Sequence, residues 1–196
     1  MTREEMITNK TKEYLSEYFD FAFQDILKDF EENSEMLLKK ILWDFEVIFQ
    51  RIKKEQELRK KGAIHYIVIS FIYSSLETET YELQIEVFDE RLYFDKNPVI
   101  GKTESYILKK YFNKEWKQYI DFMKKDILQL KLQEIYPFRK IFICKYERLI
   151  KEILSQYLPY ILKLKTYSEI QRSEDINIIY GEYYTSGIRL NEVGED

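Results

Sequence analysis

Apolar residues recur every three or four positions through the first third of the chain. One stripe occupies 7–30 and a second occupies 38–52, on either side of the polar segment EENSE at 31–35. This spacing is typical of amphipathic helices that bury one face. Ser34 is a residue type that caps helix N-termini. The pattern therefore predicts two helices that form a hairpin over 1–61.

The period changes from helical to alternating after Gly62. The segment 64–73 is apolar on both alternating faces, as in a strand that is covered on both sides. The segment 81–87 alternates apolar residues with a polar row, which predicts a strand with one wet face. Together they indicate an antiparallel meander over 63–95. The polar row expected to be exposed consists of Glu82, Gln84 and Glu86.

Helical spacing returns after the loop 95–105, which is rich in turn-forming residues and in which Thr103 is a suitable helix cap. Further apolar stripes follow on both sides of Pro137, a residue that is tolerated in a first helical turn. These features predict a second helical hairpin over 103–165. The segment 176–190 is rich in strand formers and contains two glycines, so it predicts a returning strand or hairpin.

The order of these elements predicts an α+β fold. Two long helical hairpins, an N-terminal pair and a central/C-terminal pair, are expected to pack around a small antiparallel sheet. We expect a single domain over 1–196. Its parts are a helical hairpin at 1–61, a β-meander at 62–96, a helical hairpin at 103–165 and a C-terminal β segment at 176–190.

Composition supports a globular protein, with 45% hydrophobic and 34% charged residues. Abundant Ile, Lys, Tyr and Phe together with few Gly and Pro are typical of low-GC bacterial genomes. The apolar run 63–73 is too short to span a bilayer, and the N-terminus lacks the apolar core of a signal peptide. The one cysteine, Cys144, is expected to be buried and cannot form an internal disulfide. We therefore expect a bacterial cytoplasmic protein with no membrane association.

Charged side chains concentrate in the segment DERLYFDKN at 89–97, beside a predicted strand end. Carboxylates there could hold a hard cation, so a small hydrolase or nuclease-like enzyme is one alternative function. His65, the only histidine, can lie near that end of the sheet, although its apolar strand favours a structural role. The candidate catalytic residues are His65, Asp89, Glu90, Arg91, Asp95 and Lys96.

The sequence indicates no metal or cofactor. One histidine and one cysteine cannot assemble a Cys/His zinc site. The five glycines are scattered and form no phosphate-binding loop.

A basic cluster ends the second predicted helix and makes nucleic-acid binding a second alternative function. The net charge of −4 does not favour a polyanionic partner. The residues that would carry this function are Lys54, Arg59, Lys60 and Lys61.

Protein binding is the function that the sequence favours. The predicted long helices offer more apolar surface than one small sheet covers, which favours self-association as a homodimer or binding to another protein. The glycine-flanked segment GEYYTSGIR at 181–189 also suits contact with a partner chain. Its candidate binding residues are Tyr183, Tyr184 and Arg189. We therefore expect a non-catalytic domain that binds a protein partner or its own copy.

Overall fold

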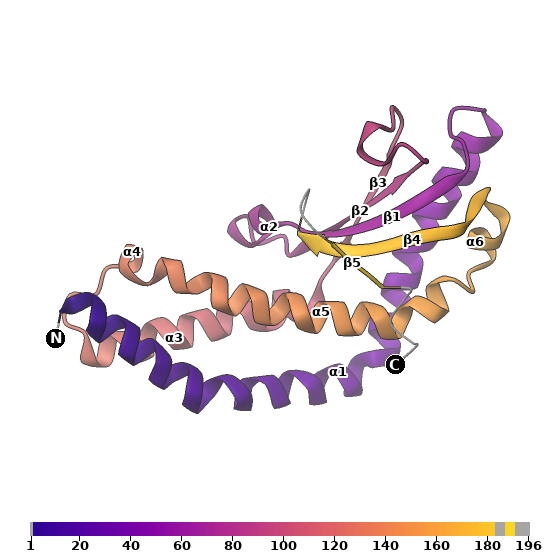
Figure 1. Ribbon diagram of the computed structural model, residues 1–196. Helices are drawn as coiled ribbons and strands as arrows, with labels where there is room; N and C mark the ends of the chain where they lie inside the picture. The colour runs from indigo at the N-terminus through magenta and orange to yellow at the C-terminus, as the bar shows by residue number, and fades with distance from the viewer. Residues whose placement is uncertain (1, 183–186, 191–196) are drawn as a thin grey trace. The chain divides into compact units, whose positions relative to one another are not determined.

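The computed structural model describes residues 2–182 and 187–190 and has an α+β fold (Figure 1). The α+β class that the sequence predicts is confirmed: two of the helices are long, and the described residues also form a small sheet of five strands. Contacts divide the described residues into two units. Unit 1 takes in residues up to Ser34 and Tyr106–Arg148, and unit 2 takes in Glu35–Ser105 and the residues from Leu149 onward.

One continuous helix, α1 (Arg3–Glu57), forms where the sequence predicts a hairpin. The predicted break at 31–35 is wrong, because this polar segment holds no glycine or proline to interrupt the helix. The Ser34 hydroxyl donates to the carbonyl of Glu31 at 2.9 Å, so it bonds back to the preceding turn and does not cap a new helix. No helix in the described part of the chain combines the length and hydrophobicity needed to cross a bilayer.

Unit 1 is built from the N-terminal part of α1, helix α3 and the first part of α5, which run alongside one another (Figure 1). Aromatic rings fill its core: the ring centroids of Tyr14 and Tyr119 are 5.2 Å apart, and those of Tyr119 and Phe142 are also 5.2 Å apart. The hydroxyls of Thr11 and Tyr119 share a 2.7 Å hydrogen bond. The elements after α1 in this unit are a π-helix (Leu108–Phe112), α3 (Asn113–Asp126), α4 (Leu132–Ile135), a 3-10 helix (Tyr136–Phe138) and the first part of α5 (Arg139–Ile161), which belongs to unit 2 from Leu149 onward.

The second helical hairpin, predicted at 103–165, differs from the structure in three details. Thr103 does not cap a helix, because it lies in a strand. Pro137 lies in the 3-10 turn directly before α5, where its missing N–H costs no helical hydrogen bond. The expected burial of Cys144 is wrong: α5 buries the face that carries Phe142 and Tyr146, and Cys144 lies on its exposed side.

Unit 2 contains a mixed sheet with strand order β3-β2-β1-β4-β5. The first three strands form the predicted antiparallel meander, and β5 runs antiparallel to β4. The parallel pairing of β4 with β1 differs from the expected antiparallel sheet, because the chain reaches β4 through a helical crossover. The strands are β1 (Ile64–Phe71), β2 (Glu82–Phe88), β3 (Val99–Glu104), β4 (Arg172–Glu182) and β5 (Gly187–Arg189), and the short helices are α2 (Tyr73–Glu77), a 3-10 helix (Leu92–Phe94) and α6 (Lys165–Glu169).

The sequence predicts that the meander ends at 95, but its third strand lies beyond that position. Residues 92–94 form a 3-10 turn, and Leu92 adopts a left-handed φ of 51°. The strand instead occupies 99–104, within the segment that the sequence indicates as a loop. Gly101 is required there for close packing, since a Cβ at this position would lie 2.5 Å from the side chain of Ile48 on α1.

The polar row on β2 is exposed only in part. Glu82 and Gln84 are half-buried, whereas Glu86 is 2% exposed between Val68 on β1 and Ile100 on β3. The prediction of an exposed row is therefore wrong at Glu86. Burial without a counter-charge raises the pKa of the Glu86 carboxyl above its ordinary value.

Candidate functional site

The charged segment at 89–97 contacts Lys61, one of the basic residues that the sequence assigned to nucleic-acid binding. The Lys61 ammonium is buried and forms an ion pair with the Asp95 carboxylate. It also donates to the backbone carbonyls of Val87 at 3.0 Å and Asn97 at 2.9 Å. Lys61 is thus withdrawn from solvent and is not part of an exposed nucleic-acid surface.

The two aspartates of this segment are satisfied by its own groups. Asp95 accepts hydrogen bonds from the backbone N–H groups of Asp89 and Asn97, at 2.9 and 2.8 Å. Asp89 accepts from the guanidinium of Arg91 at 2.5 Å, which lowers the pKa of the Asp89 carboxyl below its ordinary value. These carboxylates hold the connection between β2 and β3 in place.

The remaining predicted catalytic residues do not converge with them. His65 is half-buried on β1, and no hydrogen bond or ion pair joins it to the segment 89–97 among the residues described. Glu90 and Lys96 are exposed. The described ranges contain no group of three or more His, Cys, Asp or Glu side chains placed to hold a metal ion.

The other basic residues of the predicted nucleic-acid site, Lys54, Arg59 and Lys60, are exposed. The helix terminates differently from the prediction: Arg59, with a φ of 56°, takes the left-handed position expected of Gly62. The earlier end of α1 lets the chain turn so that Lys61 reaches Asp95.

The predicted C-terminal binding residues are only partly within the described ranges. Arg189 is exposed on β5, where it pairs in register with Ile179 on β4. Tyr183 and Tyr184 lie outside the described residues.

A buried polar trio in unit 1 is invisible in the sequence pattern. The Glu115 carboxylate accepts from the Lys145 ammonium and from the Tyr146 hydroxyl, both at 2.7 Å. Burial raises the pKa of the Tyr146 hydroxyl. All three residues are buried among aromatic side chains, so we interpret the trio as a support of the helical core.

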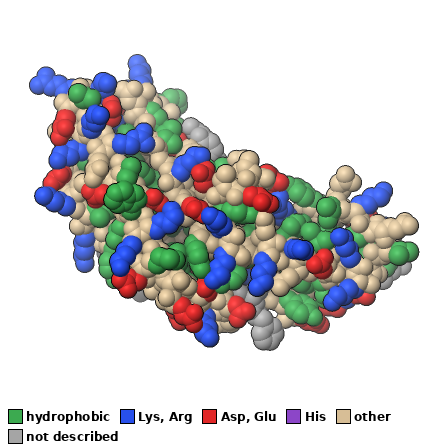
Figure 2. Space-filling view, turned by 180° about the vertical axis from the view of Figure 1, so that it is seen from behind, with side chains coloured by type: hydrophobic (Ala, Val, Ile, Leu, Met, Phe, Trp, Pro, Cys, Tyr) green, Lys and Arg blue, Asp and Glu red, His purple; other side chains and the backbone are tan. Residues whose placement is uncertain are grey.

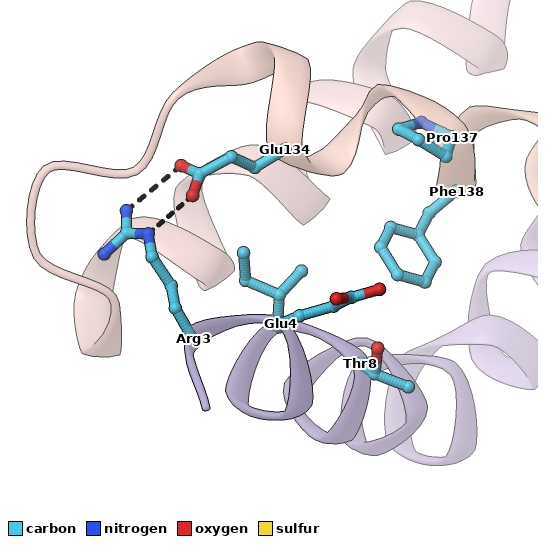
Figure 3. A pocket seen from close by; sticks show the side chains of 7 residues that line it. Arg3, Glu4, Thr8, Glu134, Pro137 and Phe138 are labelled. Atoms are coloured by element: carbon cyan, nitrogen blue, oxygen red, sulfur yellow. Dashed lines mark hydrogen bonds and ion pairs between the residues drawn. The ribbon is translucent and has the colours of Figure 1, made fainter. Parts of the chain in front are cut away.

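A cleft of about 420 Å³ in unit 1 is the open site with the most distinctive chemistry (Figure 3). Its volume is in the range of pockets that bind small molecules or side chains. The start of α1 forms one side, and α4 with the following 3-10 turn forms the other. The lining residues are Arg3, Glu4, Ile7, Thr8, Glu134, Pro137 and Phe138.

A bidentate ion pair between Arg3 and Glu134 closes one end of the cleft. The Arg3 guanidinium donates to both oxygens of Glu134, at 2.5 and 3.0 Å, and to the backbone carbonyls of Leu128 and Gln129. Glu134 also accepts from the backbone N–H of Lys131 at 2.7 Å. The hydrogen bonds from Arg3 and Lys131 lower the pKa of Glu134 to about 2. This wall therefore stays charged and closed at neutral pH.

The opposite end of the cleft presents an acidic group beside an aromatic ring. Figure 3 shows the Glu4 side chain extending toward the ring of Phe138, with Thr8 on the next turn of α1. Within the described residues, the Glu4 carboxylate has no hydrogen-bond or ion-pair partner. The buried Ile7 makes part of the lining apolar.

Exposed apolar side chains lie on the segment that leads into this cleft. Leu128 is 82% exposed, Leu132 is 57% exposed and Tyr136 is 52% exposed. We call these three residues the apolar rim. The Arg3 bond to the carbonyl of Leu128 and the position of Glu134 between Leu132 and Tyr136 connect the rim to the cleft wall. Sequence analysis missed the site, because its groups come from segments about 130 residues apart.

Comparisons with protein-family models, with curated proteins and with solved structures found no match to this chain.

Proposed function

We propose that this chain is a non-catalytic protein-binding domain, and that the cleft with its apolar rim receives a segment of a partner protein. The observation that carries this proposal is the exposure of Leu128, Leu132 and Tyr136 on the same segment, 128–136, that supplies Glu134 to the wall of an open cleft. Exposed leucines and tyrosines that are grouped next to a cavity are typical of interaction surfaces, whereas scattered ones are ordinary.

The mixture of charged and hydrophobic side chains on the rest of the surface supports a protein-binding site that is confined to one place. Hydrophobic side chains reach the surface among lysines, arginines and acids on the face drawn in Figure 2. Such mixed surface disfavours nonspecific association, so a partner gains most where apolar groups adjoin a concave site. We further propose, from composition and the single cysteine, that the protein works in the cytoplasm of a low-GC bacterium.

Selection of random displayed peptides on the purified protein tests the proposal. The enriched peptides are then bound to a rim variant that carries Leu128→Ser and Leu132→Ser, and to a control variant that carries Leu58→Ser. Leu58 is 53% exposed in unit 2, so the control removes a similar exposed side chain from another surface. We expect affinity to fall about tenfold or more in the rim variant and to stay unchanged in the control. Failure to enrich any rim-dependent peptide would contradict the proposal.

Self-association is a second candidate function, supported by an exposed stripe on α1 within unit 2. Trp43 is 70% exposed, and Met36 and Val47 are exposed at steps of seven and four residues from it. These spacings place the three side chains on one side of the helix. The flanking pairs Lys39–Glu35 and Lys40–Asp44 present both charges, so two copies can meet here without placing only like charges against each other.

Sedimentation equilibrium at micromolar concentrations tests self-association. A homodimer through this stripe should dissociate in Trp43→Ser with a dissociation constant raised more than about tenfold, because a central tryptophan dominates such interfaces. The Leu58→Ser control should remain dimeric. A wild-type protein that is monomeric throughout would eliminate this second candidate.

A further inference from the structure

We infer that the unit 1 cleft recognises a lysine or arginine side chain of the partner, held between the Glu4 carboxylate and the Phe138 ring. This inference rests on the proposed protein-binding function and specifies the chemistry of the bound segment. It requires a cation carried by an apolar stem, flanked by an apolar residue that contacts the rim.

The Glu4 carboxylate supplies the charge complement. It is exposed and lines the cleft without a partner among the described residues, so it is available to pair with a bound cation. The Phe138 ring lies beside it (Figure 3). An aromatic ring attracts a cation to its face, and a carboxylate next to the ring adds a charge-assisted hydrogen bond.

Positive charge in the cleft is not available to an anionic ligand. Arg3 is the only cationic residue among those described that line the cleft, and each of its three guanidinium nitrogens already donates within unit 1. Its two bonds to Glu134 neutralise the pair. An anion would therefore meet the Glu4 charge, with only the neutral Thr8 hydroxyl as a side-chain donor on the described lining.

The lining also favours the stem of a long basic side chain. Ile7 and Pro137 offer apolar contact along the cleft, and the Thr8 hydroxyl can accept a hydrogen bond from a cationic N–H. Lysine and arginine bury their methylene stems on such surfaces and keep the charged end at a polar group. The rim leucines then remain for a neighbouring apolar side chain of the same segment.

Matched tripeptides test this inference directly. The probes are N-acetyl-Leu-Lys-Leu-amide and its counterpart with norleucine, which keeps the stem and removes the charge. Each is titrated up to about 10 mM into the isotopically labelled full chain, a range that detects dissociation constants near 1 mM. Backbone amide shifts of 3–8, 134–136 and 138 report the binding; Pro137 has no amide proton.

We expect saturable shifts with the lysine probe and at least about fivefold weaker binding of the norleucine probe. Glu4→Gln should weaken the lysine probe about fivefold, and Phe138→Leu about threefold. Glu17→Gln is the matched control on α1, since Glu17 is exposed and does not line the cleft. It removes the same charge and should leave the affinity unchanged.

Two results would overturn the inference, and they separate it from the proposed function. Equal binding of both probes at the cleft contradicts recognition of a cation while leaving protein binding in place. Absence of cleft shifts with either probe contradicts the inference; if display selection also yields no rim-dependent peptide, the proposed function fails with it.

Discussion

Lys61 and Asp95 form an ion pair whose side chains are each 1% exposed. The sequence pattern assigns Lys61 to a nucleic-acid-binding surface and Asp95 to a catalytic site, both of which would have to be accessible to a ligand. Periodicity cannot reveal that a lysine just beyond a helix end turns inward, because the partner lies 34 positions away. Because the two side chains neutralise each other inside the protein, we assign both a structural role.

Removing one member of this pair should be costly. Lys61→Met leaves the Asp95 carboxylate buried without its counter-charge, so we expect the free energy of unfolding to fall by about 3–5 kcal/mol in urea denaturation. Lys60→Met changes the exposed neighbouring residue and should change the free energy of unfolding by less than about 0.5 kcal/mol. Equal stability of the two variants would refute the structural role of Lys61.

Glu86 is a buried carboxyl group with one oxygen, Oε2, that lacks a hydrogen-bond partner in the described structure. Because its pKa is higher in the folded than in the unfolded chain, protonation favours folding. Its contribution is most favourable below the ordinary carboxyl pKa and declines as pH rises through the raised value. We therefore expect Glu86→Gln to raise the melting temperature at pH 7 and to flatten the dependence of stability on pH above the ordinary carboxyl pKa of 4.5. Glu90→Gln, at an exposed position, should do neither.

At the scale of elements, close packing between β3 and α1 fixes the choice of glycine at position 101. A Cβ on Gly101 would lie 2.5 Å from Cδ1 and Cγ1 of the buried Ile48. Gly101→Ala should lower stability by about 1–3 kcal/mol in urea denaturation, and adding Ile48→Ala should remove that clash in a double-mutant cycle. Gly62→Ala is the control, because a Cβ added to Gly62 would have no neighbour within 4 Å. An additive cycle would contradict the contact.

The link between the start of α1 and α4 should be visible in a carboxyl titration. In the wild type, hydrogen bonds from Arg3 and Lys131 hold the pKa of Glu134 at about 2. Arg3→Gln removes the larger cause, so NMR titration should show this pKa rising toward the ordinary 4.5. The stabilisation from this depressed pKa is present above about pH 4.5 and is lost as pH falls toward 2. An unchanged pKa in Arg3→Gln would contradict the closed wall of the cleft.

Element types were predictable where hydrophobic periodicity is strong, and boundaries were not. The run in 64–71 that is apolar on both faces identifies β1, and the alternation in 82–88 identifies β2. The apolar stripes identify α1, α3 and α5. The false break in α1 arose because polar residues resemble a linker even when they have adequate helix propensity. The missed β3 arose because Pro98 and Gly101 resemble loop residues, whereas Gly101 is required by contact with α1.

At the scale of the whole molecule, the α+β class followed from the order of elements, but the candidate site did not. Its acidic group lies in the first turn of α1 and its aromatic ring directly after α4, so only tertiary structure brings Glu4 and Phe138 into one cleft. The exposure of the apolar rim is equally hidden in the sequence, because Leu128 and Leu132 look like the buried leucines of any helix. The proposed binding surface therefore exists only in the folded chain.

Hydrogen–deuterium exchange of the full chain, with and without a peptide enriched by display selection, tests the central claim most directly. The account predicts that the peptide slows exchange in 2–8 and 131–138, and that this protection is absent from the variant with Leu128→Ser and Leu132→Ser. Protection confined to other segments, such as 36–47 on α1 or the strands of the sheet, would contradict the assignment of the cleft as the protein-binding site.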